Sequence, residues 1–263
     1  MEINKNLISR FKRIIVKLGS SIIVKSQGKV NTNVLENLTS EIARLHKTKE
    51  IIMVSSGAIG LGKISLKIMH PKDMIEKQVL AAVGQPRLMH IYENLFSKYK
   101  VNVGQMLVTK YDLDDQRRFD RFRLALLRLL DHKIIPIINE NDSVAVEEIK
   151  FGDNDILSSE IASKLHADLL IILTTVDGMY KDPNNPDLGI IKHAKRFEDF
   201  KNVTISNQKS TFGTGGFHSK KRVVNRMLVG NIPTVIANGN EPKIITKMLS
   251  KKYGSWFFNG SLD

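Results

Sequence analysis

Two lysines of the sequence stand beside glycine-rich stretches that suit an anion. Lys17 lies in "VKLGSS", two residues before Gly19, and Lys220 follows a run of glycines in "TFGTGGFHSKKR". Glycine lets backbone N–H groups approach an anion without interference from a Cβ atom, and a helix start adds a positive dipole end. Each stretch is a candidate phosphate cradle, although each also fits an ordinary turn or loop with a solvent-facing lysine.

The pattern around Lys220 differs from the P-loop of nucleotide-binding proteins. In the pattern G-x-x-x-x-G-K-[ST] a second glycine precedes the lysine, and Ser219 stands there in this sequence. The physical parts are nevertheless alike, because bare amides, an expected helix start and a lysine come together. A cation near a helix N-terminus is unfavourable, and a bound anion would compensate for it.

A third stretch, "VSSGAIGLGK", places Ser55, Ser56 and Gly57 directly after an apolar run. Hydroxyl groups and bare amides at the carboxyl end of a strand suit a carboxylate or a phosphate. The alternative is a glycine-rich connection chosen for close packing of a helix.

Carboxylates and amides gather in "INENDSVAVEEIKFGDNDILSS", which contains Asp142, Asp153, Asn154 and Asp155. Such carboxylates can hold Mg²⁺, orient lysines or bind an ammonium group, and calcium-loop spacing is absent. Asn and Asp also favour turns and helix caps. The alternative is therefore that Asn154 or Asp155 only caps a helix that begins at Ile156.

The elements that must position these residues alternate along the chain. Six apolar runs predict strands, namely "RIIVKLG", "EIIMVSSG", "VNVGQMLVT", "KIIPIINEND", "DLLIILTTVDG" and "IPTVIANG", and helical spacing of apolar residues predicts helices near 31–47, 117–133, 154–170 and 215–230. This order indicates an α/β protein, a three-layer αβα sandwich around a mainly parallel central sheet. Ligands of such sheets bind at the carboxyl ends of the strands, where the polar stretches stand.

Composition narrows the class of protein. The chain has 263 residues, no cysteine and a formal net charge of +13, from 40 Lys and Arg against 27 Asp and Glu. The cations are spread along the chain with few aromatic residues between them, which favours small anionic substrates over nucleic acid. Neither a membrane-spanning run nor a signal peptide is apparent, so we expect a cytoplasmic protein without a membrane partner.

The motifs, taken in order, resemble one known family. "VKLGSS", "VSSGAIGLG", "LAAVGQPRLM", "VGQMLVT", "INENDSV", "FGDNDILS" and "GTGGFHSK" are similar to those of the glutamate 5-kinases of the amino-acid kinase superfamily, from about Arg13 to Phe258. The resemblance implies ATP-dependent phosphorylation of the γ-carboxylate of L-glutamate, the first step of proline biosynthesis. It also implies a short form without the C-terminal PUA domain that many members carry.

The resemblance assigns roles to residues. Lys17 and Lys220 would contact the phosphates and the transferring group, and Asp155 would hold these two lysines. Glutamate would bind at Ser56, Asp142 and Asn154. The nucleotide positions would be Lys17, Gly19, Ser20, Thr174, Thr175, Thr214, Gly215, Gly216, Phe217, His218, Ser219 and Lys220. The family commonly has Asp where this chain has Thr175, and no residue is assigned as a metal ligand.

The resemblance further implies ATP and Mg²⁺ as cofactors, proline as feedback inhibitor and a homo-oligomer, either dimer or tetramer. We expect one domain over 1–263, in which about 1–160 binds the acceptor and about 161–263 binds the nucleotide. Two alternatives stay open: a superfamily kinase with a different carboxylate or phosphate acceptor, and a non-catalytic amino-acid sensor or RNA-binding protein.

Overall fold

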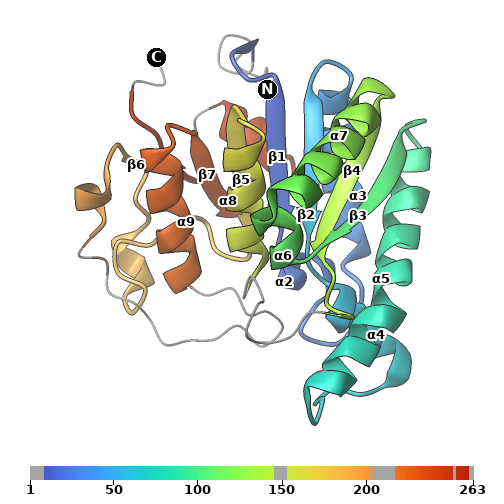
Figure 1. Cartoon of the computed structure of the whole chain (residues 1–263). Coiled ribbons are helices and arrows are strands. Elements are labelled where there is room, and N and C mark those ends of the chain that lie inside the picture. Colours follow the sequence, from blue (N-terminus) through green and yellow to red (C-terminus); the bar gives the residue numbers. More distant parts are fainter. Residues whose placement is uncertain (1–8, 145–152, 202, 204–216, 251–252, 261–263) are drawn as a thin grey trace.

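A single eight-stranded sheet forms the centre of the molecule (Figure 1). The structure, a computed structural model, describes residues 9–144, 153–201, 203, 217–250 and 253–260. The strands follow the spatial order β3-β4-β2-β1-β5-β7-β8-β6, and only β8 runs antiparallel to its neighbour β7. Their bounds are β1 Arg13–Leu18, β2 Glu50–Ser55, β3 Asn102–Val108, β4 Ile134–Glu140, β5 Leu169–Thr174, β6 His193–Ala194, β7 Thr234–Asn238 and β8 Ser255–Phe257.

Helices cover both faces of this sheet. The apolar side chains of α2, α3, α4, α5 and α10 pack on one face, and those of α6, α7, α8 and α9 pack on the other. The predicted three-layer sandwich is thus confirmed. The helix bounds are α2 Ser20–Ile23, α3 Thr32–His46, α4 Ala58–Leu66, α5 Met74–Ser97, α6 Lys110–Asp114, α7 Gln116–Asp131, α8 Asn154–Lys164, α9 Phe217–Val229 and α10 Ile244–Leu249, with short 3-10 turns at Pro186–Leu188 and Phe197–Asp199.

The six predicted strands are all present, at β1 to β5 and β7. Strands β6 and β8 were not predicted, because two or three residues are too short to show a pattern. The first four strands form one half of the sheet and the last four form the other half, and β1 and β5 pair at the boundary. Strand β1 pairs in parallel with β2 and β5, and β2 pairs in parallel with β4. The carboxyl ends of these four strands therefore lie at the same end of the sheet.

Close helix packing explains the glycines of "SSGAIGLG". Gly57 precedes α4 with a φ of 106°, in the left-handed region that glycine adopts without strain. Within α4, a Cβ atom on Gly62 would overlap the carbonyl oxygen of Leu80, and one on Gly84 of α5 would overlap that of Ala58. These glycines serve close helix packing, which holds α5 directly against α4, and the ligand-binding role of Ser56 in the same stretch stays a prediction.

The loop after β5 contains a short turn, and the lengths of the helices bear on a membrane location. The segment 181–189 forms a hairpin-like turn, in which the Lys181 N–H donates to the Gly189 carbonyl oxygen and Tyr180 bridges to Ile190. Among the helices of the described residues, none is long and apolar enough to cross a membrane.

Candidate functional site

The position of Lys17 follows from the alternation of β1. Ile14, Val16 and Leu18 point into the core beneath α3 and α5, whereas Ile15 points to the opposite face. Successive side chains of a strand alternate between faces, so Lys17 shares the face of Ile15, which α8 and α9 cover. Its side chain is buried, with 5% exposure, and needs a partner there.

The start of α8 supplies that partner. The helix is capped by Asp153, whose Oδ1 accepts hydrogen bonds from the N–H groups of Asp155 and Ile156. The alternative in which Asn154 or Asp155 caps the helix is therefore wrong by one or two positions. Because Asp153 performs the capping, the Asp155 carboxylate is available inside the protein, where it is fully buried.

Asp155 joins the two lysines. Lys17 Nζ pairs with its Oδ1, and Lys220 Nζ of α9 donates to its Oδ2 at 2.9 Å. We call Lys17, Asp155 and Lys220 the lysine–aspartate centre. Burial alone would raise the pKa of the Asp155 carboxyl, but the charges of Lys17 and Lys220 outweigh burial and hold this pKa well below its usual range. One negative charge against two positive charges leaves the centre with an excess positive charge, which suits an anionic ligand.

The turn after β1 and the end of β5 lie beside each other. Leu18 is paired with Leu173, and the Gly19 N–H donates to the Leu173 carbonyl oxygen at 3.1 Å. The Gly19 amide is thus engaged within the protein, and the next amides of the turn are those of Ser20 and Ser21. Thr174 ends β5 next to this turn and Thr175 follows it.

At the other side of the lysine–aspartate centre, Asn154 begins a chain of amide groups. Its Nδ2 donates to Ser56 Oγ at 2.9 Å and to Asn139 Oδ1 at 2.8 Å. Asn139 Nδ2 in turn donates to Gln85 Oε1 at 2.9 Å. We call Gln85, Asn139, Asn154 and Ser56 the amide chain. It connects α5, β4, α8 and the end of β2, and it lies mostly buried.

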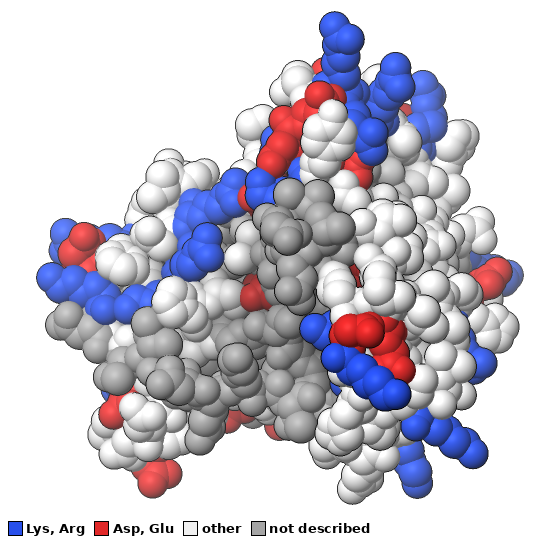
Figure 2. Space-filling view, turned by 60° about the horizontal axis from the view of Figure 1, so that its bottom comes forward, with Lys and Arg blue, Asp and Glu red and all other residues white. Residues whose placement is uncertain are grey.

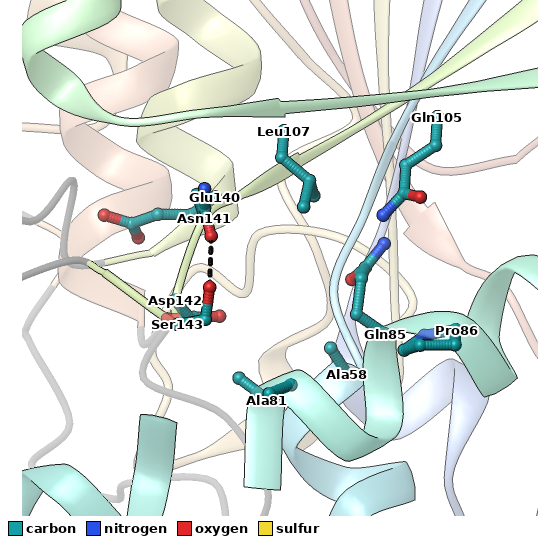
Figure 3. A pocket seen from close by; sticks show the side chains of 11 residues that line it. Ala58, Ala81, Gln85, Pro86, Gln105, Leu107, Glu140, Asn141, Asp142 and Ser143 are labelled. Carbon is teal, nitrogen blue, oxygen red and sulfur yellow. Dashed lines mark hydrogen bonds between the residues drawn. The ribbon is translucent and has the colours of Figure 1, made fainter. Parts of the chain in front are cut away.

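A cavity of about 280 Å³ adjoins the amide chain (Figure 3). Gln85 and small apolar residues of α5 form one wall, Gln105 and Leu107 of β3 another, and the turn that follows β4 contributes Asp142. This volume of about 280 Å³ lies just below the range for small-molecule sites, about 300–1,000 Å³. It suits a ligand smaller than a typical drug, and it holds both a carboxylate and amide groups.

The structure therefore brings together most of the predicted site residues that it describes. Lys17, Asp155 and Lys220 meet directly, and Ser56 and Asn154 are hydrogen-bonded beside them, because Asn154 precedes Asp155 on α8. Asp142 lies in the cavity, which the lysine–aspartate centre does not line. Phe217, His218 and Ser219 form the first turn of α9, before Lys220. Thr214, Gly215 and Gly216 lie outside the described residues.

Two residues of the amide chain were not predicted to belong to the site. Gln85 lies within the motif "LAAVGQPRLM", and Asn139 within "INENDSV". A glutamine among small apolar residues of a buried helix was the available signal, since a buried amide needs partners.

The surface at the carboxyl ends of the central strands carries both positive and negative side chains. Figure 2 brings forward the side of the molecule at which the central strands end, and Lys and Arg lie there in separate groups, some beside Asp or Glu. Among the described residues, no cluster of three or more acidic, histidine or cysteine side chains has a geometry that could hold a metal ion.

Comparisons with known proteins agree on the kind of fold and on a family. Residues 12–238 match the model of the amino acid kinase family. A glutamate 5-kinase of Clostridium acetobutylicum is 41% identical over 95% of both chains. Another, from Caldanaerobacter subterraneus subsp. tengcongensis, is 40% identical over 93% of this chain and 67% of its own length.

Two solved structures share the fold. A carbamate kinase from Giardia lamblia bound to AMP-PNP superposes with a TM-score of 0.66, covering 96% of this chain and 100% of its own, at 17% identity. A UMP kinase from Bacillus anthracis gives a TM-score of 0.62 over 95% of this chain and 97% of its own, also at 17% identity.

Proposed function

The chain belongs to the glutamate 5-kinase family of the amino acid kinases, and from this premise we propose that it phosphorylates L-glutamate with ATP. The product is L-glutamyl 5-phosphate, and the reaction is the first step of proline biosynthesis. The observation that carries the proposal is the lysine–aspartate centre, in which two buried lysines share one buried aspartate.

The reaction needs charge compensation and positioning more than acid–base chemistry. A γ-carboxylate with an ordinary pKa of about 4.3 is ionised at neutral pH and attacks as it stands. One of its oxygens bonds to the γ-phosphorus of ATP, the bond to the β–γ bridging oxygen breaks, and ADP leaves with that electron pair. No proton moves, so no histidine has to act as a base.

Lys17 and Lys220 are suited to neutralise the moving phosphoryl group. An ammonium group has three N–H donors, and each lysine directs one of them at Asp155. The remaining donors are available to phosphate oxygens. We propose that Asp155 positions the two lysines and does not itself contact the phosphoryl group, since its oxygens already face the two ammonium groups.

The two halves of the sheet would bind different substrates. The acceptor would bind on the side of β2 and β4, within about 1–160, through Ser56, Asn154 and Asp142. The nucleotide would bind at the carboxyl ends of β1 and β5, on the side of the sheet formed by about 161–263. It would lie near Ser20, Thr174, Thr175 and the start of α9. Gly19 would act by shaping the turn, because its amide donates to Leu173.

Three further features belong to the proposal. Magnesium would arrive bound to the nucleotide phosphates, as is usual for Mg²⁺. Proline would compete with glutamate, and the enzyme would work as a dimer or tetramer in the cytoplasm. Competition kinetics and light scattering test the inhibitor and the assembly.

The chemical identity of the product tests the main proposal. Purified protein is incubated with ATP, Mg²⁺, L-glutamate and hydroxylamine, which converts an acyl phosphate to a hydroxamate. We expect γ-glutamyl hydroxamate and ADP in equal amounts. ADP release that depends on glutamate but yields no hydroxamate would contradict transfer to the carboxylate.

A further inference from the structure

Gln85 is the member of the amide chain that also lines the cavity, and one of its polar atoms has no hydrogen-bond partner among the described residues. The side chain is buried, with 8% exposure, and its Oε1 accepts from Asn139. Its Nε2 is shielded from solvent and has no hydrogen-bond partner among the residues that the structure describes. A buried donor without an acceptor is unfavourable, so this nitrogen marks a place where a ligand acceptor would be stabilising.

The orientation of the Gln85 amide is fixed by the backbone. The Glu140 N–H donates to Asn139 Oδ1 at 2.9 Å, and a backbone N–H can only donate. The other end of the Asn139 amide must therefore be its NH₂ group, which faces Gln85. That contact requires an oxygen on Gln85, so the NH₂ group of Gln85 is the free end.

The same reasoning fixes the far end of the amide chain. Asn139 Oδ1 also accepts from Asn154 Nδ2, which donates to Ser56 Oγ. Ser56 accepts this bond, so its own hydroxyl proton is available to another acceptor. The amide chain therefore ends in a donor at Gln85 and in a donor at Ser56, which together favour an acceptor-rich ligand.

The surroundings of Gln85 Nε2 narrow the ligand further. Figure 3 shows the Gln85 side chain rising from α5 toward Gln105 of β3, across the cavity from the turn that carries Asp142. A carboxylate on one side and an amide donor on the other are complementary to the ammonium and the carboxylate of an amino-acid head group. Small apolar residues of α4 and α5, namely Ala58, Ala81, Ala82 and Pro86, line the cavity beside Gln85, and the polar residues Glu140, Asn141 and Ser143 line it beside Asp142.

We propose that Gln85 determines which substrate accepts the phosphoryl group, because its Nε2 donates a hydrogen bond to the α-carboxylate of glutamate. This inference rests on the proposed function and adds a residue to its substrate site. The second contact of Gln85, to Asn139, keeps Asn154 and Ser56 oriented from the same side chain. Recognition of the head group and orientation of the donors near the lysine–aspartate centre are thereby connected.

Two variants separate the two contacts. Gln85→Met has a similar length and removes both contacts, whereas Gln85→Glu keeps an oxygen for Asn139, removes the donor and adds a negative charge that would repel the α-carboxylate. For both we expect the KM for glutamate to rise about 10-fold to 100-fold, with kcat within about threefold and the KM for ATP within about twofold. Gln116→Glu makes the same chemical change at the exposed start of α7 and serves as the matched control.

Two inhibitors distinguish a binding role from a general loosening of the cavity. Glutarate keeps both carboxylates of glutamate, and 4-aminobutyrate lacks the α-carboxylate. In Gln85→Met we expect the inhibition constant of glutarate to rise by the same factor as the KM for glutamate, and that of 4-aminobutyrate to stay within about twofold.

An unchanged KM for glutamate in both variants would overturn the inference, as would an equal loss for 4-aminobutyrate. A wild-type protein that does not phosphorylate glutamate would instead contradict the proposed function, and the inference would fail with it. The wild-type rate, measured in the same assay, tells these two failures apart.

Discussion

The lysine–aspartate centre and the amide chain meet at adjacent residues of α8, yet they are built by different physical means. Asp155 is held by two full charges in a fully buried position, whereas Asn154 is held by neutral hydrogen bonds whose direction is set from a backbone amide. Charge acts over distance and tolerates small shifts, but an amide network depends on geometry. The comparison suggests that the charged part serves the reaction and the neutral part serves recognition of the acceptor.

The largest effect is expected when a positive charge is removed from the lysine–aspartate centre. Lys220→Met should lower kcat by about 10³-fold or more, because a cation on the transferring phosphoryl group contributes at least that much in related reactions. The KM for glutamate should stay within about threefold. Steady-state kinetics measure both. The control is Lys98→Met, which breaks an exposed 2.8 Å pair with Glu36 and should leave kcat within about twofold.

A second test concerns stability. Asp155→Asn leaves two buried lysines without a counter-charge, so the free energy of unfolding at pH 7 should fall by about 3–5 kcal/mol. The pKa of Asp155 is lowered in the folded state, so its stabilising contribution is present above the ordinary pKa of about 3.9 and is lost as the pH falls below it.

Urea unfolding between pH 3 and 7 checks this dependence on pH. The difference between wild type and Asp155→Asn should be constant above about pH 5 and should shrink toward pH 3. A difference that grows on acidification would mean that Asp155 is not held as a carboxylate by the two lysines.

A third test addresses the scaffold of the amide chain. Gly84→Ala places a Cβ atom against the Ala58 carbonyl, and both backbones must shift. We expect a loss of about 1–3 kcal/mol in the free energy of unfolding and a raised KM for glutamate, because Gln85 is the next residue. In Gly230→Ala the nearest atom is at 3.5 Å, and stability should change by less than about 0.5 kcal/mol.

The smallest test removes one link of the amide chain. Asn154→Ala should raise the KM for glutamate about 10-fold and leave kcat within about threefold, the reverse of the pattern for Lys220→Met. Asn94→Ala, which removes an exposed amide hydrogen-bonded to His90, is the matched control. A fall in kcat without a change in KM would place Asn154 with the charged part of the site.

The sequence predicted the sheet better than the helices. Strands such as Arg13–Leu18 are recognisable because both of their faces are buried. Their sequences are therefore nearly continuous runs of apolar, β-branched residues. The 24-residue helix α5 was missed, since Gly84 and Pro86 are signals that end helices. Packing against α4 overrides them, and that packing depends on contacts between Gly84 and Ala58 that local propensity does not describe.

For the site, residue types indicated an anion and a carboxylate cluster but not their pairing. Lys17, Asp155 and Lys220 are separated by long stretches of chain, and their association was expected only from the resemblance to a family. Gln85 was missed because its role depends on tertiary contacts, through which Asn139 and Glu140 fix its orientation. A position that is recognisable only from such a network gives little signal in a single sequence.

The central claim is that the lysine–aspartate centre transfers a phosphoryl group to glutamate. Its most direct test is the initial rate of ADP release by wild type and Lys220→Met with ATP, Mg²⁺ and one acceptor at a time: glutamate, aspartate, carbamate or uridylate. We predict that glutamate gives the fastest wild-type rate, and that Lys220→Met lowers this rate at least about 10³-fold. Faster release with another acceptor, or a glutamate-dependent rate unchanged in Lys220→Met, would contradict the account.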